Sequence, residues 1–159
     1  MNQHIESVIL QFDIPDGAWT AEPYGNGHIN ETYLLVTSRP HLYILQKLST
    51  QAFKNIPGLM ENVIAVTQYL SEKDSDPRHA LRLIPTLGGD LYLATADGEY
   101  WRTYDFVLDS LCLDKPETAE DLHQSGVAFG VFQNQLADFP AEKSAKSIPE
   151  SVSSVKIPE

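Results

Sequence analysis

The sequence has a single cysteine, few basic residues and no long apolar segment, and each shortage excludes a class of protein. Cys112 is the only cysteine among 159 residues, so no intrachain disulfide can form and a reducing cytoplasm is the expected location. Lys and Arg number 11 against 22 Asp and Glu, and the net charge of -11 argues against nucleic-acid and anionic-membrane binding. No apolar run approaches the roughly 20 residues of a membrane span, and we expect no signal peptide from residues 1–6.

What remains is an ordinary globular composition, with 42% hydrophobic and 21% charged residues. Helical spacing of apolar residues predicts helices at about 5–12, 59–70 and 118–138. Runs rich in aromatic and branched residues predict strands at 29–37, 41–48, 81–85, 91–95 and 100–108. Consecutive strands with short connections cannot be parallel neighbours, so the sequence predicts an α+β fold, an antiparallel sheet with a packed helix. Residues 141–159, rich in Ser, Lys, Glu and Pro, are predicted to be a flexible tail.

The sharpest local motif is YGNGHINETY at residues 24–33, where two glycines open onto a strand. Such a hairpin can bring backbone N–H groups close to phosphates, because no Cβ intervenes. The alternative is a tight turn that needs a positive φ, and the short motif alone favours the turn. A Rossmann interpretation is weaker, because a strand follows the glycines where a helix is required.

A second motif joins the strand YILQKL at residues 43–48 to the helix that carries Glu61 and Asn62. Protein kinases grip the α- and β-phosphates with a strand lysine that pairs with a helix residue about fifteen positions further on. The alternative is a solvated lysine. The five histidines have no ligand spacing with one another or with Cys112, so we predict no metal site built from them.

Together these segments resemble a known family. EPYGNGHINETY at 22–33, YILQK at 43–47, LMENV at 59–63, YWRTYDF at 100–106 and SGVAFGVFQ at 125–133 are similar to the N-terminal part of the aminoglycoside phosphotransferase / choline kinase family, above all its N-acetylhexosamine 1-kinase branch. The resemblance covers roughly Glu22 to Pro149.

The resemblance implies a kinase-like N-lobe over residues 1–110, with a five-stranded antiparallel sheet and a packed helix. Residues 111–140 would then be the hinge exit and a helix from the start of the second lobe. It also implies ATP with Mg²⁺, and an amino sugar, such as N-acetylglucosamine or N-acetylgalactosamine, phosphorylated at O1.

The resemblance also assigns site residues. Gly25, Asn26, Gly27, His28 and Asn30 would lie on the phosphate-covering hairpin, and Tyr104, Asp105, Phe106 and Val107 at the hinge that meets adenine. Gln46 falls where kinases carry their strand lysine, and Asn62 or Glu61 would be its helix partner. Gln46 shares a strand face with Ile44, so Lys47 could take this role only in a shifted register.

The chain departs from the family at its catalytic motifs. The His-x-Asp catalytic loop with its following Asn, and the Asp segment that binds metal, have no counterpart in the sequence. We therefore expect no catalytic residue and no metal ligand, and a truncated kinase lobe that is inactive alone. The alternative is a non-catalytic nucleotide-binding, sugar-binding or regulatory module.

The apolar stripe of the third predicted helix includes Leu122, Phe129, Phe132 and Leu136. In a two-lobed kinase this stripe packs on helices that the sequence lacks. It predicts a homodimer or a separately encoded second lobe as the partner, and the alternative is a helix that folds back onto its own lobe.

Overall fold

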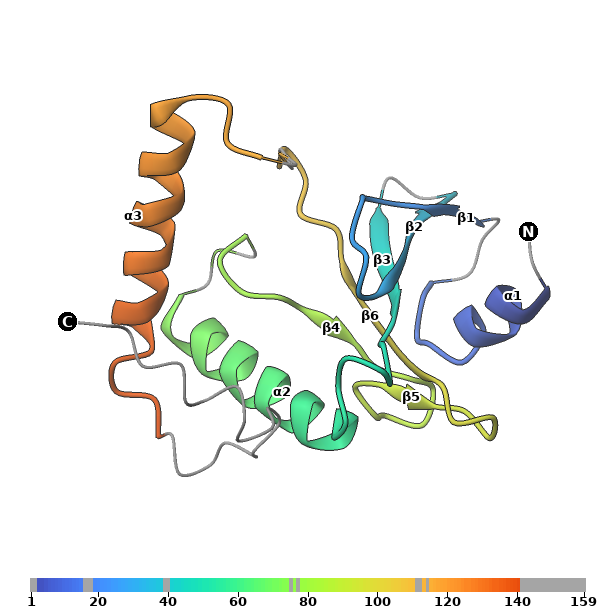
Figure 1. Ribbon diagram of the computed structural model, residues 1–159. Helices are drawn as coiled ribbons and strands as arrows, with labels where there is room; N and C mark the ends of the chain where they lie inside the picture. The colour runs from blue at the N-terminus through green and yellow to red at the C-terminus, as the bar shows by residue number, and fades with distance from the viewer. Residues whose placement is uncertain are drawn as a thin grey trace.

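The computed structural model describes residues 3–15, 19–38, 41–74, 76, 78–110, 113 and 115–140. The described part of the chain contains three helices and six strands (Figure 1): α1 (Gln3–Ile9), β1 (Trp19–Pro23), β2 (Glu31–Thr37), β3 (Leu42–Lys47), α2 (Ile56–Lys73), β4 (Leu83–Ile84), β5 (Leu93–Ala94), β6 (Tyr100–Asp105) and α3 (Ala119–Gln135). The predicted tail, 141–159, lies outside the described residues.

The strands form one antiparallel sheet in the order β1-β2-β3-β6-β4, with β5 also paired to β6. This confirms the α+β fold with an antiparallel sheet. The sheet has one strand more than the five predicted, because β1 was missed. Its sequence, Trp-Thr-Ala-Glu-Pro, alternates apolar and polar residues but is only five residues long and ends in a proline. Pro23 is tolerated because β1 lies at the edge of the sheet.

One face of the sheet, here called the α1 face, carries the larger apolar core. Alternate residues of β2, β3 and β6 point to this face, among them Leu35, Leu45 and Trp101, each at most 1% exposed. The short helix α1 packs against them through Ile5 and Ile9. Burial of these side chains closes the α1 face to solvent and anchors the three central strands.

The opposite face, here called the α2 face, is covered only in part. Helix α2 packs its Ile56 and Met60 against Leu48, with Leu83 and Tyr100 beside them. The helix begins at a cap, where the side chain of the residue before it accepts a 3.0 Å hydrogen bond from the Gly58 N–H. Figure 1 shows α1 and α2 on opposite sides of the sheet.

Helix α3 stands apart from the sheet (Figure 1), and none of its residues is buried. It begins with a capping box, in which Thr118 and Asp121 satisfy each other's backbone N–H groups. Its C-terminal end contacts α2, where Lys73 Nζ donates to the Gln135 carbonyl at 3.0 Å and Tyr69 meets Phe139 edge-on. Within the described residues, no helix has the length and apolar character needed to cross a membrane.

Candidate functional site

The glycine hairpin (residues 25–30) connects β1 to β2 and is exposed. Gly25 adopts φ +76°, a conformation that favours glycine, and a Cβ added at Gly25 or Gly27 would meet no atom within 4 Å. The Tyr24 N–H donates to the Thr32 carbonyl at 2.9 Å and closes the base of the loop. Residues 23–25 and 27–33 line an open hollow of about 290 Å³. The hairpin is therefore a tight turn whose backbone is accessible. This geometry fits both the interpretation as a simple turn and the interpretation as a phosphate-binding loop.

The polar side chains of the hairpin have different surroundings. Asn30 Oδ1 accepts a 2.9 Å hydrogen bond from the Ser49 N–H, which ties the start of β2 to the end of β3. Asn26 and His28 are exposed, and both lie on the loop itself. Asn30 therefore holds the hairpin on the sheet, and Asn26 and His28 lie on its exposed part.

The register of β3 separates Gln46 from Lys47. Gln46 lies opposite Arg102 on the α2 face, and Lys47 lies opposite Trp101 on the α1 face. Lys47 Nζ is 2.7 Å from Glu99 Oε1 and 3.5 Å from Glu31 Oε1. Hydrogen bonding to Glu99 is the main cause that raises the pKa of Lys47. Lys47 is therefore held on the side of the sheet that faces α1.

Gln46 is the centre of a small polar cluster on the α2 face. Its Nε2 donates to Thr32 Oγ1 at 3.1 Å, and its Oε1 accepts from Arg102 Nε at 3.0 Å and from Arg102 Nη2 at 2.7 Å. Glu61 is exposed on α2 and Asn62 is half-buried there. The hydrogen-bond partners of Gln46 thus come from β2 and β6, and the expected helix partner is not among them.

Arg102 was missed by the sequence reasoning. YWRTYDF was singled out for its likeness to a family, and no local signal in it separates Arg102 from a solvated strand arginine. The only feature that identifies it is the pairing of β6 with β3, which joins residues 56 positions apart. Contacts at that separation depend on strand register and leave no periodic mark in the sequence.

The four expected hinge residues do not share one environment. Tyr104 is half-buried on the α2 face, and burial raises the pKa of its phenol. The Asp105 carboxylate lies on the other side, where Arg82 and His41 bind it. Burial alone would raise the pKa of Asp105, but these two donors bring it below its ordinary value. The Phe106 N–H donates to the Leu42 carbonyl at 3.0 Å and continues the sheet.

One contact brings the expected hairpin and hinge together. The ring of Tyr24, just before the hairpin, meets the ring of Phe106 edge-on, with centroids 5.7 Å apart and planes at 82°. Edge-to-face aromatic pairs stabilise by about 0.5–1.5 kcal/mol beyond their buried area. The hairpin is thereby held near the segment that leaves β6.

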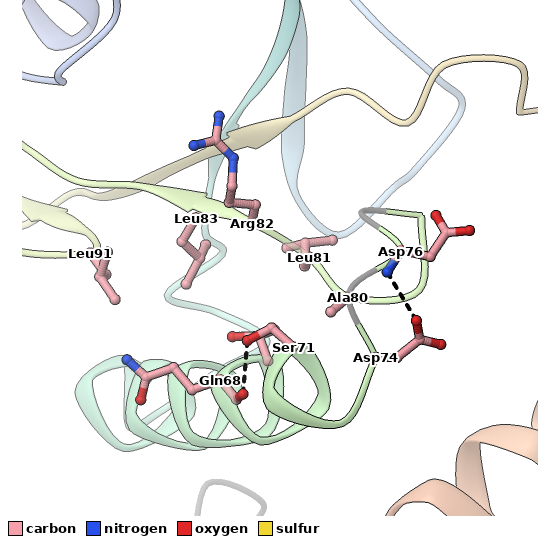
Figure 2. Close-up of a pocket in the computed structure, with 10 residues that line it drawn as sticks. Gln68, Ser71, Asp74, Asp76, Ala80, Leu81, Arg82, Leu83 and Leu91 are labelled. Atoms are coloured by element: carbon pink, nitrogen blue, oxygen red, sulfur yellow. Dashed lines mark hydrogen bonds between the residues drawn. The ribbon is translucent and has the colours of Figure 1, made fainter.

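Two further hollows lie beside β4. The first, of about 390 Å³, lies between the last turns of α2 and residues 80–83. Figure 2 shows Leu83 pointing toward α2. The second, about 630 Å³, includes Asp105, Phe106 and Val107. Asp74 and Asp76 line both hollows, and hydrogen bonds lower the pKa of each carboxyl. Arg82 also lines both hollows, so their walls carry charges of both signs.

The described residues contain no group of three or more His, Cys, Asp or Glu side chains that could hold a metal ion. No step is therefore assigned to a metal held by the described part of the chain.

Comparisons with known proteins identify the fold. No family model matches the chain. It superposes on a microcompartment-associated aminopropanol kinase with a TM-score of 0.53 and 14% identity, over 78% of this chain and 37% of that one. It superposes on spectinomycin phosphotransferase, solved with ADP and spectinomycin, with a TM-score of 0.50 and 16% identity, over 94% of this chain and 39% of that one.

These matches confirm the expected kinase-like N-lobe as a fold. At identities of 14% and 16% they establish the architecture, and the chain spans less than two fifths of the length of either neighbour. The glycine hairpin, the Gln46 cluster and residues 104–107 therefore belong to a sheet with the fold of a kinase-like N-lobe.

Proposed function

We propose that this chain is the nucleotide-binding lobe of an ATP-dependent phosphotransferase that acts on a small molecule, and that the substrate is an N-acetylhexosamine. The observation that carries the proposal is the Tyr24–Phe106 contact, which joins the glycine hairpin to the hinge segment on a kinase-like sheet. The sugar rests on the sequence resemblance. In one matched structure the phosphotransferase is in complex with ADP, which supports the choice of nucleotide.

In this proposal ATP is held by two segments, the glycine hairpin and the hinge segment. The backbone of Gly25 and Gly27 covers the phosphates, since both positions are open to solvent and free of a Cβ. Backbone groups of the segment from Tyr104 to Val107 meet the adenine. When bound, the nucleotide supplies the transferable phosphoryl group, and the residues of this chain orient it.

Catalysis by this chain alone is not expected. Phosphoryl transfer depends on positioning and on charge stabilisation by a base and metal-bound carboxylates, and the sequence contains neither motif. A coupled ADP-release assay with N-acetylhexosamine, ATP and Mg²⁺ should give no turnover above that of a heat-denatured sample. Turnover that survives repurification would contradict the inactive lobe and leave the nucleotide site standing.

Nucleotide binding should be weak. One wall of a cleft holds the ligand, and the phosphates approach a chain with a net charge of -11. We expect a millimolar dissociation constant, which corresponds to about 4 kcal/mol. Isothermal titration calorimetry with ATP measures this constant, and a titration with adenosine, which has no phosphates, is the control. A micromolar dissociation constant for ATP would contradict the proposal that this chain supplies only one wall of the nucleotide site.

The second candidate function is a non-catalytic interaction module, for which α3 offers a surface. Its apolar side chains are exposed, with Leu122 at 61% and Phe129 at 70%. In the module a second copy of the chain covers them, whereas in a split kinase a separately encoded lobe does. In either case we propose that the chain works in a reducing cytoplasm. Gene context separates the two functions, because an adjacent reading frame with the missing kinase motifs favours a split kinase.

A further inference from the structure

Arg102 has an unusual environment for an arginine. Its side chain is half-buried, between the sheet and α2, and burial lowers the pKa of its guanidinium. Gln46 Oε1 accepts two of its N–H groups, and a third lies 4.0 Å from Met60 Sδ. The guanidinium also lies 5.8 Å from the centre of the Tyr104 ring. An arginine has five N–H donors, so two are left without a protein acceptor among the described residues.

The other cations of the sheet region differ from Arg102. Lys47 pairs with Glu99, Arg82 pairs with Asp105, and Arg78 pairs with Asp76. Arg102 alone among these four has no carboxylate partner in the described part of the chain, although acidic residues outnumber basic ones two to one. A half-buried charge without a counterion is costly, and an external anion can offset that cost.

The position of Arg102 indicates which anion. Gln46 links it to Thr32, and Thr32 is one of the residues that line the hollow under the glycine hairpin. The one carboxylate of that hollow, Glu31, is tied to Lys47 and accepts from the Tyr33 hydroxyl. Through Gln46 and Thr32 the uncompensated guanidinium is linked to the loop whose backbone is open to phosphates, whereas Lys47, which contacts Glu31 of the same hollow, is already neutralised by Glu99.

We propose that Arg102 binds the polyphosphate of the nucleotide and takes over from β6 the task that kinases assign to a lysine on the neighbouring strand. Gln46, which stands at that strand position, is a positioning residue. Its amide oxygen holds two N–H groups of Arg102, while its NH₂ is fixed by Thr32. This orientation of the amide follows from chemistry, because a guanidinium only donates and needs an acceptor. The remaining N–H groups then form charge-assisted bonds to phosphate oxygens.

This inference rests on the proposed function for the identity of the ligand. The test uses the intact chain with tripolyphosphate, ATP and adenosine as separate ligands, followed by amide and side-chain NMR shifts. Arg102→Met removes the guanidinium, and Arg102→Lys retains a charge without the paired donors. Lys47→Met is the matched control, because it removes the same charge from the neighbouring strand on the opposite face.

We expect Arg102→Met to weaken tripolyphosphate and ATP binding about tenfold, with adenosine binding unchanged and Lys47→Met within about twofold of the wild type. Arg102→Lys should fall between. In the wild type the Arg102 Nε–H resonance should shift with tripolyphosphate, a readout that does not depend on the folding of any variant.

The outcomes separate the two proposals. If tripolyphosphate leaves the Arg102 resonance unmoved, or if Arg102→Met and Lys47→Met weaken binding equally, the Arg102 site is wrong. If ATP still binds in that case, the nucleotide lobe stands without it. A third outcome is that tripolyphosphate binds through Arg102, ATP binds no more tightly than tripolyphosphate, and adenosine does not bind. In that case the anion site stands and the proposed nucleotide-binding lobe is wrong.

Discussion

The two faces of the sheet treat their cations differently. On the α1 face Lys47 is neutralised within the protein by Glu99, which also accepts from His4 and Trp101. On the α2 face, at the preceding residue of β3, the side-chain amide of Gln46 accepts two hydrogen bonds from Arg102, which has no carboxylate partner among the described residues. The first arrangement completes a folded core. The second arrangement leaves the positive charge of Arg102 available to a ligand. Functional sites are the places where proteins depart from the rules of stable packing in this way.

The comparison extends to packing. The α1 face has a continuous apolar core under α1, whereas the α2 face is covered at one end by α2 and α3 covers neither. Surface that a domain leaves exposed marks the places where ligands and partners bind. The predictions below test the closed face first for stability and the open surfaces for association.

The largest effect should come from the closed face. Trp101 is 1% exposed in the centre of the core, so Trp101→Ala should lower the free energy of unfolding by about 3–5 kcal/mol. Urea denaturation followed by far-UV circular dichroism measures it. Leu87→Ala, at a residue 71% exposed, is the control and should change stability by less than about 0.5 kcal/mol. Equal losses for both would mean that the α1 face is not the core.

The next effect concerns the open surface of α3. If two copies associate through it, Phe129→Glu with Phe132→Glu should convert a dimer to a folded monomer, because each buried aromatic contributes roughly 1.5–3 kcal/mol. Light scattering at tens of micromolar gives the mass. Thr118→Ala is the control, since it removes the N-cap and leaves the apolar stripe intact. A monomeric wild type, or a double mutant that stays dimeric, refutes association through α3.

A smaller effect with the opposite sign is expected at Thr103. Its hydroxyl is fully buried on the α1 face and has no hydrogen-bond partner among the described residues. Thr103→Val replaces the hydroxyl with a methyl group of similar size, so the variant should be about 1 kcal/mol more stable. Thermal unfolding measures the change. A destabilised variant would show that the Thr103 hydroxyl has a hydrogen-bond partner, such as a buried water molecule.

The smallest effect is a pH dependence at Glu99. Hydrogen bonding from Lys47, then from His4 and Trp101, lowers the pKa of Glu99 to about 2 from its ordinary 4.5. A depressed carboxyl pKa stabilises the fold above pH 4.5, and this contribution is lost as the pH falls from 4.5 to 2. Glu99→Gln should flatten that part of the stability curve and cost less than about 1 kcal/mol at neutral pH. Lys47→Met should flatten it too, and an unchanged slope in both variants would contradict the pairing.

The sequence predicted what local pattern controls. Helical periodicity predicted all three helices, and runs of aromatic and branched residues predicted the five strands other than β1, whose short segment ends in a proline. It also predicted that Gln46 and Lys47 point to opposite faces. It did not predict Arg102, because its role depends on the register of β6 against β3. Nor did it decide the exposure of α3, since an apolar stripe has the same spacing whether or not a partner covers it.

The measurement that tests the central claim most directly is an amide NMR titration of the intact chain with ATP to about 10 mM. The account predicts shifts confined to the glycine hairpin, to Thr32, Gln46 and Arg102 on the α2 face, and to the hinge segment, with residues under α1 unmoved. Shifts centred on the α1 face, or none at all, would contradict a nucleotide-binding lobe.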